Sequence, residues 1–257
     1  MAIDLDGTLL DSRSIISEKN KDAIKGCLDL GIGIVITTAK SVHWVKGLTK
    51  RLSLKDPQIS SSGAAIIDNT GKVISTRPIP QYLFKRLVSI SRENDVGFGA
   101  SCIDGFVYYE KQDQYLEYVW ETGELPKKTA DLCDDRISKQ VLLIVYAIDK
   151  DHPVNKIVRD ELGDELDIKR AGKYYLTGHN RHTSKLKALT QILKDKGIDS
   201  KNTMAIGDSE SDMEIMKFAG IGVAMGNSPE QVKDAADLVV SDNDNDGVAE
   251  ALERFVL

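Results

Sequence analysis

Apolar and polar positions along this chain change their period in a regular order, which predicts that strands and helices alternate. Short continuous apolar runs are typical of strands buried on both faces of a parallel sheet, whereas apolar residues three and four positions apart are typical of helices with one buried face. The N-terminal part predicts, in order, an opening strand, a helix from Ser17 to Gly31, a strand at 33–38, a helix with Val45, Leu48 and Leu52 on one side, and a strand at 64–67. This order is that of a doubly wound sheet.

The same pattern returns in the C-terminal part of the chain. Its predicted elements are a helix from Ser184 to Lys194, a strand at 203–207, a helix from about 211 to Gly220, a strand at 222–225, a short helix opened by Ser228 and Pro229, and a last strand at 238–240. Strands and helices therefore continue to alternate, as expected for the second half of one sheet.

A different pattern separates these two parts. Pro78 and Pro80 are typical of a linker, and the stretch after them predicts strands at 105–109 and 141–146 and a helix at 153–162 opened by Pro153. We therefore predict an α/β fold with a Rossmann-like doubly wound parallel sheet core, formed by residues 1–78 and 181–257, and an inserted α+β cap domain at 79–180.

Composition narrows the class of ligand. The chain has 257 residues, of which 41% are hydrophobic and 29% charged, which is ordinary for a globular protein that buries a core. Its net charge of −6 argues against nucleic acid or an anionic membrane as the main partner, and no apolar stretch approaches the roughly 18 residues that span a bilayer. Three separated cysteines fit a reducing compartment. We expect a cytoplasmic protein with a small soluble ligand; the sequence leaves its oligomeric state open.

Several carboxylates interrupt the apolar runs where strands end. Asp4 and Asp6 lie in the opening strand, although burying an unpaired carboxylate costs several kcal/mol. Asp208 follows the strand at 203–207, and Asp212 comes one helical turn later. Ligands of open parallel sheets bind beyond the carboxyl ends of the strands. We therefore expect one site to gather Asp4, Asp6, Thr38, Lys185, Asp208 and Asp212.

Such a set of residues favours phosphoryl chemistry with a metal ion. Clustered carboxylates need a cation, and ligands that are all hard oxygens point to Mg²⁺ rather than zinc. A carboxylate can attack phosphorus and form an aspartyl-phosphate. Gly7 lets the chain turn directly after Asp6, which makes Asp6 a candidate general acid and then general base.

Six stretches occur in the order found in a known superfamily. They are DLDGTLLDS from Asp4, the strand end at Thr38, TSKLKAL around Lys185, GDSESDMEIM around Asp208, GVAMGN from Gly222, and DGVAEAL from Asp246. Together they resemble the four motifs and the trailing signature of the haloacid dehalogenase superfamily, specifically its Cof-type phosphatase branch. The resemblance implies a Mg²⁺-dependent phosphatase that hydrolyses a small phosphorylated metabolite, either a sugar phosphate or a phospho-acid; archaeal phosphoglycolate phosphatases are one specific parallel.

The resemblance also assigns roles to residues. Asp4 matches the nucleophile and Asp6 the general acid and base, while Thr38 and Lys185 match phosphate contacts. The implied metal ligands are Asp4, Asp6 through its backbone carbonyl, Asp208 and Asp212.

Three stretches depart from the family's wording. Thr38-Ala39-Lys40 replaces T-G-R, Ser62-Gly63-Ala64 replaces N-G-A, and Ser211 replaces the asparagine of G-D-x-x-N-D. These positions lie on the substrate side of the pattern, so Ala39 and Ser211 are expected near phosphate or substrate, and specificity or rate is more affected than reaction class.

Three other interpretations remain. A phosphomutase similar to eukaryotic phosphomannomutase shares Asp4, Asp6 and a cap, and a catalytically weak sensor or partner-binding module fits the departures. The stretch from Asp242 to Glu253 also satisfies the calcium EF-hand pattern. An EF-hand loop needs a helix before it, and a strand is predicted there, so we expect a solvated acidic loop that caps the last helix.

Overall fold

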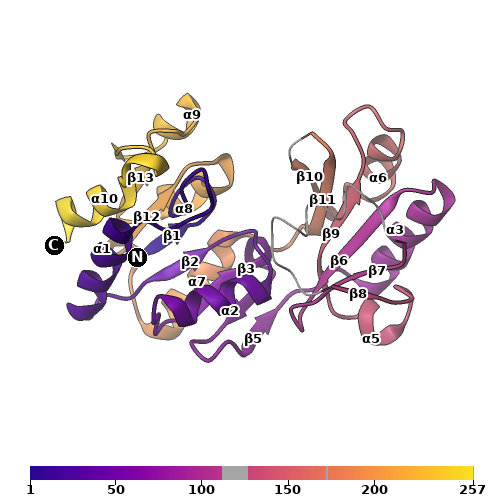
Figure 1. Cartoon of the computed structure of the whole chain (residues 1–257), viewed down its shortest axis with the longest axis horizontal. Coiled ribbons are helices and arrows are strands. Elements are labelled where there is room, and N and C mark those ends of the chain that lie inside the picture. Colours follow the sequence, from indigo (N-terminus) through magenta and orange to yellow (C-terminus); the bar gives the residue numbers. More distant parts are fainter. Residues whose placement is uncertain (112–126, 172, 257) are drawn as a thin grey trace. The chain divides into compact units, whose positions relative to one another are not determined.

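The computed structural model describes residues 1–111, 127–171 and 173–256, which form two compact units (Figure 1). The first unit contains the described residues of 1–39, 45–72 and 184–257, and the second unit those of 40–44 and 73–183. The strands are β1 (Ala2–Asp4), β2 (Val35–Thr37), β3 (Gln58–Ser60), β4 (Ala65–Ile67), β5 (Val73–Thr76), β6 (Gly97–Cys102), β7 (Val107–Tyr109), β8 (Lys127–Thr129), β9 (Val141–Ala147), β10 (Leu166–Ala171), β11 (Tyr175–Asn180), β12 (Met204–Gly207), β13 (Ile221–Ala224) and β14 (Leu238–Val239).

Helices connect most of these strands. They are α1 (Glu18–Asp29), α2 (Val42–Arg51), α3 (Gln81–Glu93), α5 (Asp135–Ser138), α6 (Val154–Leu162), α7 (Lys185–Lys196), α8 (Met213–Phe218), α9 (Glu230–Lys233) and α10 (Gly247–Phe255). Short 3-10 helices lie at Ser61–Gly63, Ser200–Asn202, Glu210–Asp212 and Asn243–Asn245. In the described part of the chain, no helix has the length and hydropathy needed to cross a bilayer.

The larger sheet is doubly wound around β1. Its strand order is β14-β13-β12-β1-β2-β3-β4-β5, and β1 pairs in parallel with β2 on one side and with β12 on the other. Pairing is also parallel between β2 and β3, β12 and β13, and β13 and β14. The predicted α/β class with a parallel sheet core is therefore confirmed, and the carboxyl end of β1 lies where the two halves of the sheet meet.

One predicted strand has the wrong direction. The sequence predicts residues 64–67 as the third parallel strand, but β4 there runs antiparallel to β3, which is the strand that pairs with β2. The pattern misses β3 because Gln58, a fully buried polar residue, begins it. The Gln58 amide donates to the carbonyl of Ile34 at 3.0 Å, and its Oε1 accepts from Ile36 N at 2.7 Å. The Gln58 side chain thus satisfies two buried backbone groups, the carbonyl of Ile34 and the N–H of Ile36.

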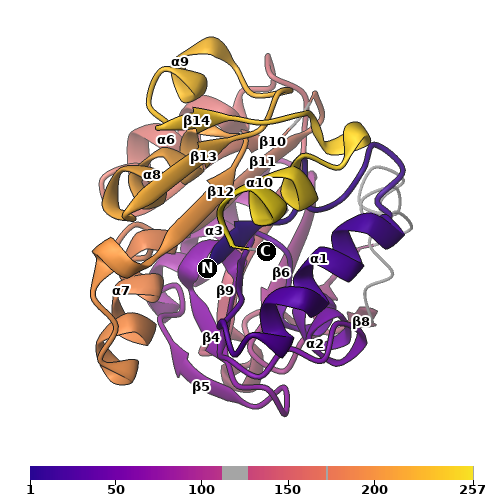
Figure 2. The ribbon, with the colours of Figure 1, turned by 90° about the vertical axis from the view of Figure 1, so that its left-hand side faces the viewer.

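Two pairs of helices cover the faces of this sheet. Figure 2 shows α1 beside α10 and α7 beside α8, on opposite sides of the strands. Apolar residues of α7 and α8 pack against small and branched residues of the strands in one buried cluster; its members include Ala2, Val35, Ile59, Leu189, Ile192, Ala205, Ile215 and Met216. Ser17, where the first helix is predicted to begin, caps α1 by accepting from Asn20 N. Ser184, where the predicted helix at 184–194 begins, caps α7 by accepting from Lys187 N.

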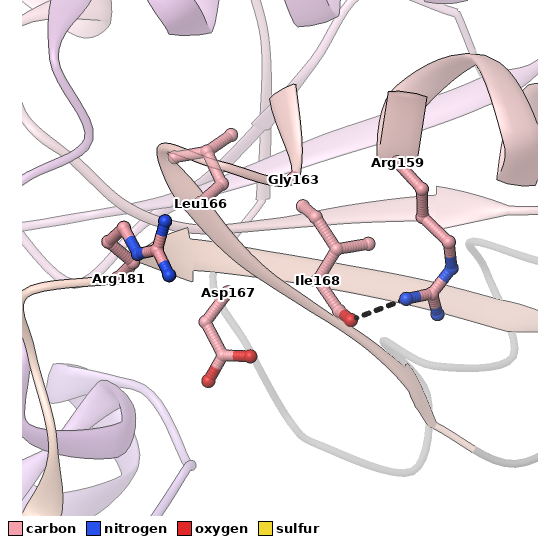
Figure 3. Close-up of a pocket in the computed structure, with 6 residues that line it drawn as sticks. All are labelled: Arg159, Gly163, Leu166, Asp167, Ile168 and Arg181. Carbon is pink, nitrogen blue, oxygen red and sulfur yellow. Dashed lines mark hydrogen bonds between the residues drawn. The ribbon is translucent and has the colours of Figure 1, made fainter. Parts of the chain in front are cut away.

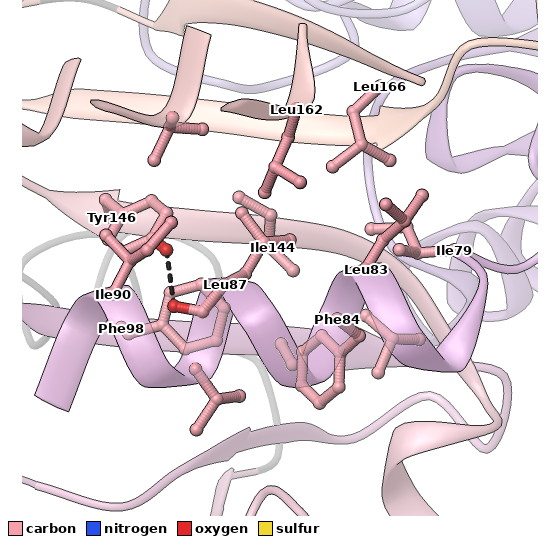
Figure 4. Close-up of a cluster of buried hydrophobic side chains, with 14 of the residues drawn as sticks. Ile79, Leu83, Phe84, Leu87, Ile90, Phe98, Ile144, Tyr146, Leu162 and Leu166 are labelled. Carbon is pink, nitrogen blue, oxygen red and sulfur yellow. Dashed lines mark hydrogen bonds between the residues drawn. The ribbon is translucent and has the colours of Figure 1, made fainter. Parts of the chain in front are cut away.

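The second unit has its own sheet and core. The sheet order is β10-β11-β9-β6-β7-β8, with antiparallel pairs except for the parallel pair of β7 and β8. Figure 4 shows side chains of α3 packed against β6 and β9, and the Tyr146 hydroxyl donates to the carbonyl of Leu87 at 2.5 Å. Ile79, which lies between the two prolines of the predicted linker, is 1% exposed and belongs to this core. Its N–H donates to the carbonyl of Val141 at 2.8 Å.

Candidate active site

Lys185 connects two buried carboxylates at the carboxyl edge of the larger sheet. Its Nζ lies 2.6 Å from Asp4 Oδ1 and 2.7 Å from Asp212 Oδ1. Asp4 ends β1, Lys185 begins α7, and Asp212 follows β12 by way of a 3-10 helix. All three side chains are almost fully buried. A cation at a helix N-terminus is unfavourable, so the two carboxylates supply the charge that holds this ammonium in place.

Asp208 is held beside this group by the turn after β1. Its Oδ1 accepts a hydrogen bond from the Thr8 hydroxyl at 2.7 Å. Gly7 adopts a φ of +77°, and a Cβ at this position would lie 2.5 Å from Asp208 Oδ2. The absence of a side chain at Gly7 therefore allows the close approach of Asp208 to the turn.

A second close approach places the start of α7. Gly63 has a φ of +91°, and a Cβ there would lie 2.3 Å from the carbonyl oxygen of Ser184. Ser184 is the N-cap residue of α7, directly before Lys185. Packing of the Gly63 backbone against this cap therefore fixes where the Lys185 side chain begins.

Asp4, Asp208 and Asp212 offer carboxylate oxygens that all lie within 4.8 Å of one another. Such a spacing of hard oxygen atoms suits a small divalent cation like Mg²⁺. Asp212 is oriented by Ser209, whose N–H and hydroxyl donate to Asp212 Oδ2 at 3.2 Å and 2.7 Å. This leaves Asp212 Oδ1 on the side of Lys185.

The electrostatics of the cluster favour added positive charge. Burial raises the pKa of Asp4 to about 8. The positive charge of Lys185 lowers this pKa, whereas the negative charges of Asp212 and Asp208 raise it further. Burial also raises the pKa of Asp208, although the hydrogen bond from Thr8 opposes it. Burial by itself lowers the pKa of Lys185, but the charges of Asp4 and Asp212 outweigh it and raise that pKa. One ammonium is therefore too little positive charge for three adjacent carboxylates.

The other predicted site residues lie around the same strand ends. Asp6 follows β1 as an exposed residue whose backbone forms an isolated bridge with Leu10. Thr38 follows β2, the neighbour of β1; it is 1% exposed, and its backbone hydrogen-bonds with Ile59 and Ser62. Asp6 is thus outside the group of three carboxylates whose oxygens approach one another.

Two of the positions that depart from the family's wording, Ala39 and Ser211, are exposed. Ala39 comes directly after Thr38, and Ser211 lies in the 3-10 helix before α8. The Ser211 hydroxyl is 2.9 Å from the Ser209 hydroxyl, which in turn donates to Asp212 Oδ2. Ser211 is therefore linked to Asp212 through Ser209.

Sequence reasoning assigned no role to three residues that shape the site. Thr8 contacts Asp208, Ser209 contacts Asp212, and Asn227 donates from Nδ2 to the carbonyl of Gly7 at 2.8 Å. Thr8 and Ser209 stand inside the D-x-D-G-T-L and G-D-S stretches, which is a signal that could have found them. Asn227 likewise stands at the end of the G-V-A-M-G-N stretch, which carries the same kind of signal.

The EF-hand interpretation fails in the structure, as predicted, but the expected side-chain cap of the last helix is wrong, because Asp246 precedes α10 without a capping hydrogen bond from its side chain. The strand β14, not a helix, precedes the acidic loop at 242–246. Its carboxylates accept hydrogen bonds from the chain: Asp242 from Asp244 N at 3.0 Å, Asp244 from Ser12 N at 2.8 Å, and Asp246 from the Ser17 hydroxyl at 2.5 Å. The carboxylates of the loop are therefore engaged in hydrogen bonds within the loop and with the segment before α1.

Comparisons with known proteins agree with a doubly wound α/β enzyme. The family model of haloacid dehalogenase-like hydrolases matches residues 1–252, and the chain therefore belongs to this family. A relative from Bacillus subtilis, 5-amino-6-(5-phospho-D-ribitylamino)uracil phosphatase YcsE, is 28% identical over 100% of this chain and 95% of its own. Pyridoxal phosphate phosphatase YbhA from Escherichia coli is 27% identical over 100% of this chain and 98% of its own.

A solved structure shares the whole fold. A haloacid dehalogenase-like hydrolase from Bacteroides thetaiotaomicron superposes with a TM-score of 0.91 at 28% identity, over 98% of this chain and 97% of that one. The resemblance that the motifs indicate and the enzyme class that it implies are both confirmed.

Proposed function

We propose that this protein is a Mg²⁺-dependent phosphatase that hydrolyses a small phosphorylated metabolite through an aspartyl-phosphate on Asp4. The single observation that carries the proposal is the pair of contacts of Lys185 Nζ, 2.6 Å from Asp4 and 2.7 Å from Asp212. This places a fixed ammonium beside a carboxylate at the end of the central strand, where a phosphoryl group and its attacking oxygen can share one positive neighbour.

The donor set fits Mg²⁺. Asp4, Asp208 and Asp212 present hard oxygens within 4.8 Å of one another, and the backbone carbonyl of Asp6 lies two residues after Asp4 in the chain. When bound, the ion neutralises negative charge on the carboxylates and on the phosphoryl oxygens. Lys185 remains as the protein's own cation for the same task.

The first half of the reaction forms a covalent bond to Asp4. A carboxylate oxygen of Asp4 attacks phosphorus, the bond from phosphorus to the substrate's ester oxygen breaks, and the leaving alcohol takes a proton from Asp6. The exposed position of Asp6 suits a group that meets both the leaving alcohol and water. Thr38 and Lys185 are the proposed contacts of the phosphoryl oxygens, with Ala39 and Ser211 on the substrate side.

The second half releases phosphate. Asp6, now a carboxylate, takes a proton from a water molecule, and the water oxygen attacks phosphorus while the bond to Asp4 breaks. Inorganic phosphate leaves, Asp4 returns as a carboxylate, and Asp6 is protonated again. Division into two displacements lets one carboxylate act as nucleophile and the other carry the proton.

The substrate class follows from the relatives and from the charge of the chain. Two relatives carry the names of phosphatases that act on small phosphorylated molecules. The net charge of −6 argues against a polyanion as the main partner. A sugar phosphate or phospho-acid therefore remains our proposal, in a cytoplasmic setting. The insertion predicted at 79–180, which lies within the second unit, is proposed as the cap domain that selects the leaving group.

Turnover of p-nitrophenyl phosphate by the purified chain tests the proposal. We expect phosphate release with Mg²⁺, loss of release with excess EDTA, and no release by Asp4→Asn in either case. A panel of phosphorylated metabolites then identifies the substrate by released phosphate. Absence of turnover across metals, pH values and the panel would contradict the proposed function, and product analysis with mannose 1-phosphate separates hydrolysis from phosphoryl transfer within a sugar.

A further inference from the structure

The second unit contains a pocket whose lining residues are not part of the candidate active site. It has a volume of about 330 Å³ and is lined by Arg159, Gly163, Leu166, Asp167, Ile168 and Arg181 (Figure 3). These residues come from α6 and the turn after it, from the edge strand β10, and from the segment that follows β11. The volume is at the lower end of the range for pockets that bind small molecules.

Both arginines of the pocket are held by backbone carbonyls. Arg159 donates from Nη1 to the carbonyl of Ile168 at 3.1 Å, and Arg181 donates from Nη1 to the carbonyl of Asp164. A guanidinium has five N–H donors, so one bond to a carbonyl fixes the group and leaves several donors for a ligand. Because the arginine side chains are already held in place, they lose less conformational entropy when a ligand binds.

Neither guanidinium has a carboxylate partner in the part of the chain that the structure describes. Four carboxylates of the neighbouring segments are already engaged: Asp160 with Lys156 at 2.6 Å, Glu161 with Arg86 at 2.8 Å, Asp167 with Lys169 at 2.7 Å, and Glu165 with the Tyr82 hydroxyl. The lining therefore carries two guanidiniums against the single carboxylate of Asp167, which already pairs with Lys169. This excess of positive charge is left for an external anion, for which a guanidinium is the favoured protein group.

The positions of the two arginines define the ligand. In Figure 3 their guanidinium groups lie at opposite ends of the pocket, with Asp167 and Ile168 between them. Because the two guanidiniums stand on either side of Asp167 and Ile168 in this view, each can bind a different acidic group of one ligand. We infer that this pocket binds a small molecule with two separated acidic groups, such as a dicarboxylate or a phosphonocarboxylate, with one acidic group on Arg159 and the other on Arg181.

Calorimetric titration of the whole metal-free chain tests this inference. The probes are succinate, glutarate and phosphonoacetate, with acetate as a single acidic group of the same chemistry. We expect one saturable site per chain, with acetate binding roughly tenfold more weakly because it engages one guanidinium instead of two. Metal is removed beforehand on a chelating resin, because soluble EDTA is itself a polycarboxylate that would compete for the pocket. Without metal there is no turnover, so the outcome does not depend on the proposed phosphatase activity.

Matched variants locate the site. Arg159→Gln and Arg181→Gln are each expected to weaken succinate binding roughly tenfold, and the double variant to lose it. Arg136→Gln is the control, because it removes an exposed arginine of the same unit whose guanidinium lies 2.6 Å from Asp134. Arg159→Lys and Arg181→Lys keep the charge and should retain part of the affinity, while thermal unfolding shows whether each variant is folded.

Three results would overturn the inference. The first is the absence of saturable binding up to millimolar probe. The second is acetate binding as tightly as succinate. The third is binding that survives in the double arginine variant, or that Lys185→Gln removes instead, because the probe would then occupy the carboxylate site of the first unit.

Discussion

The ammonium of Lys185 lies 2.6 Å from Asp4 Oδ1, although the two residues are 181 positions apart in the sequence. Asp212 completes the contact from the other side at 2.7 Å. The three groups are almost fully buried, so each depends on the others for its charge. Changes within this group and in the turn after β1 therefore have effects that can be measured separately on stability, on metal binding and on turnover.

Replacement of Lys185 by methionine should destabilise the metal-free chain. Loss of one partner of a buried ion pair typically costs about 3–5 kcal/mol, because the remaining charge stays buried without compensation. We expect urea unfolding in EDTA to show a loss of this order for Lys185→Met, and added Mg²⁺ to restore part of it. Unchanged stability in EDTA would contradict the charge balance described here.

Asp6→Ala separates proton transfer from metal binding. The variant keeps the backbone carbonyl of Asp6 and the three clustered carboxylates, so Mg²⁺ affinity should change little. Turnover should fall by about 10² to 10⁴, the usual contribution of a general acid and base. Steady-state kinetics together with Mg²⁺ titration by calorimetry checks both parts, and near-native turnover would rule out the role given to Asp6.

Asp4→Asn should remove turnover without unfolding the protein. The substitution takes away the proposed nucleophile and one negative charge of a crowded cluster, while the amide oxygen can still accept from Lys185. We expect no release of phosphate and a thermal midpoint near that of the native chain. Incubation of the native chain with substrate followed by rapid acid quench should trap phosphate on the protein, and Asp4→Asn should trap none; label on the variant would point to another nucleophile.

Gly7→Ala and Gly31→Ala form a matched pair. Gly7 has a φ of +77° and Gly31 a φ of +78°. Alanine at either position should therefore lower the free energy of unfolding by about 1–2 kcal/mol through backbone strain. Only at Gly7 would the new Cβ meet another atom, 2.5 Å from Asp208 Oδ2, whereas nothing lies within 4 Å at Gly31. We expect similar losses of stability but weaker Mg²⁺ binding and turnover for Gly7→Ala alone. Equal effects on turnover would show that the contact with Asp208 is unimportant.

His179 predicts a loss of stability in mild acid. It is 6% exposed, and burial lowers its pKa. The charge of Asp167, whose Oδ2 lies 3.4 Å from His179 Nε2, raises this pKa, and the charge of Lys169 lowers it. Below the ordinary value near 6.5 the unfolded chain binds a proton here that the folded chain does not, so the free energy of unfolding falls as pH decreases toward the lowered pKa. Urea unfolding between pH 7.5 and 5.5 should show a smaller decrease for His179→Gln than for the native chain; equal slopes would exclude His179 as the cause.

The sequence by itself determined most elements of the doubly wound core and the class of the protein. Local patterns suffice there, because a strand buried on both faces is apolar throughout and a covering helix repeats its apolar residues every three to four positions. Caps such as Ser17 and Ser184 act within one turn of their helices. The motifs are equally local, and the family match over residues 1–252 agrees with what they indicate.

Only the tertiary structure decided how distant residues combine. The strand β3 was missed because Gln58 satisfies backbone groups of a neighbouring strand, which no local pattern reveals. The bridge from Lys185 to Asp4 and Asp212, and the hydrogen bond from Thr8 to Asp208 across 200 positions, likewise depend on where strands end in space. Such contacts arise from packing between elements, and their energies depend on burial, which a sequence pattern does not measure.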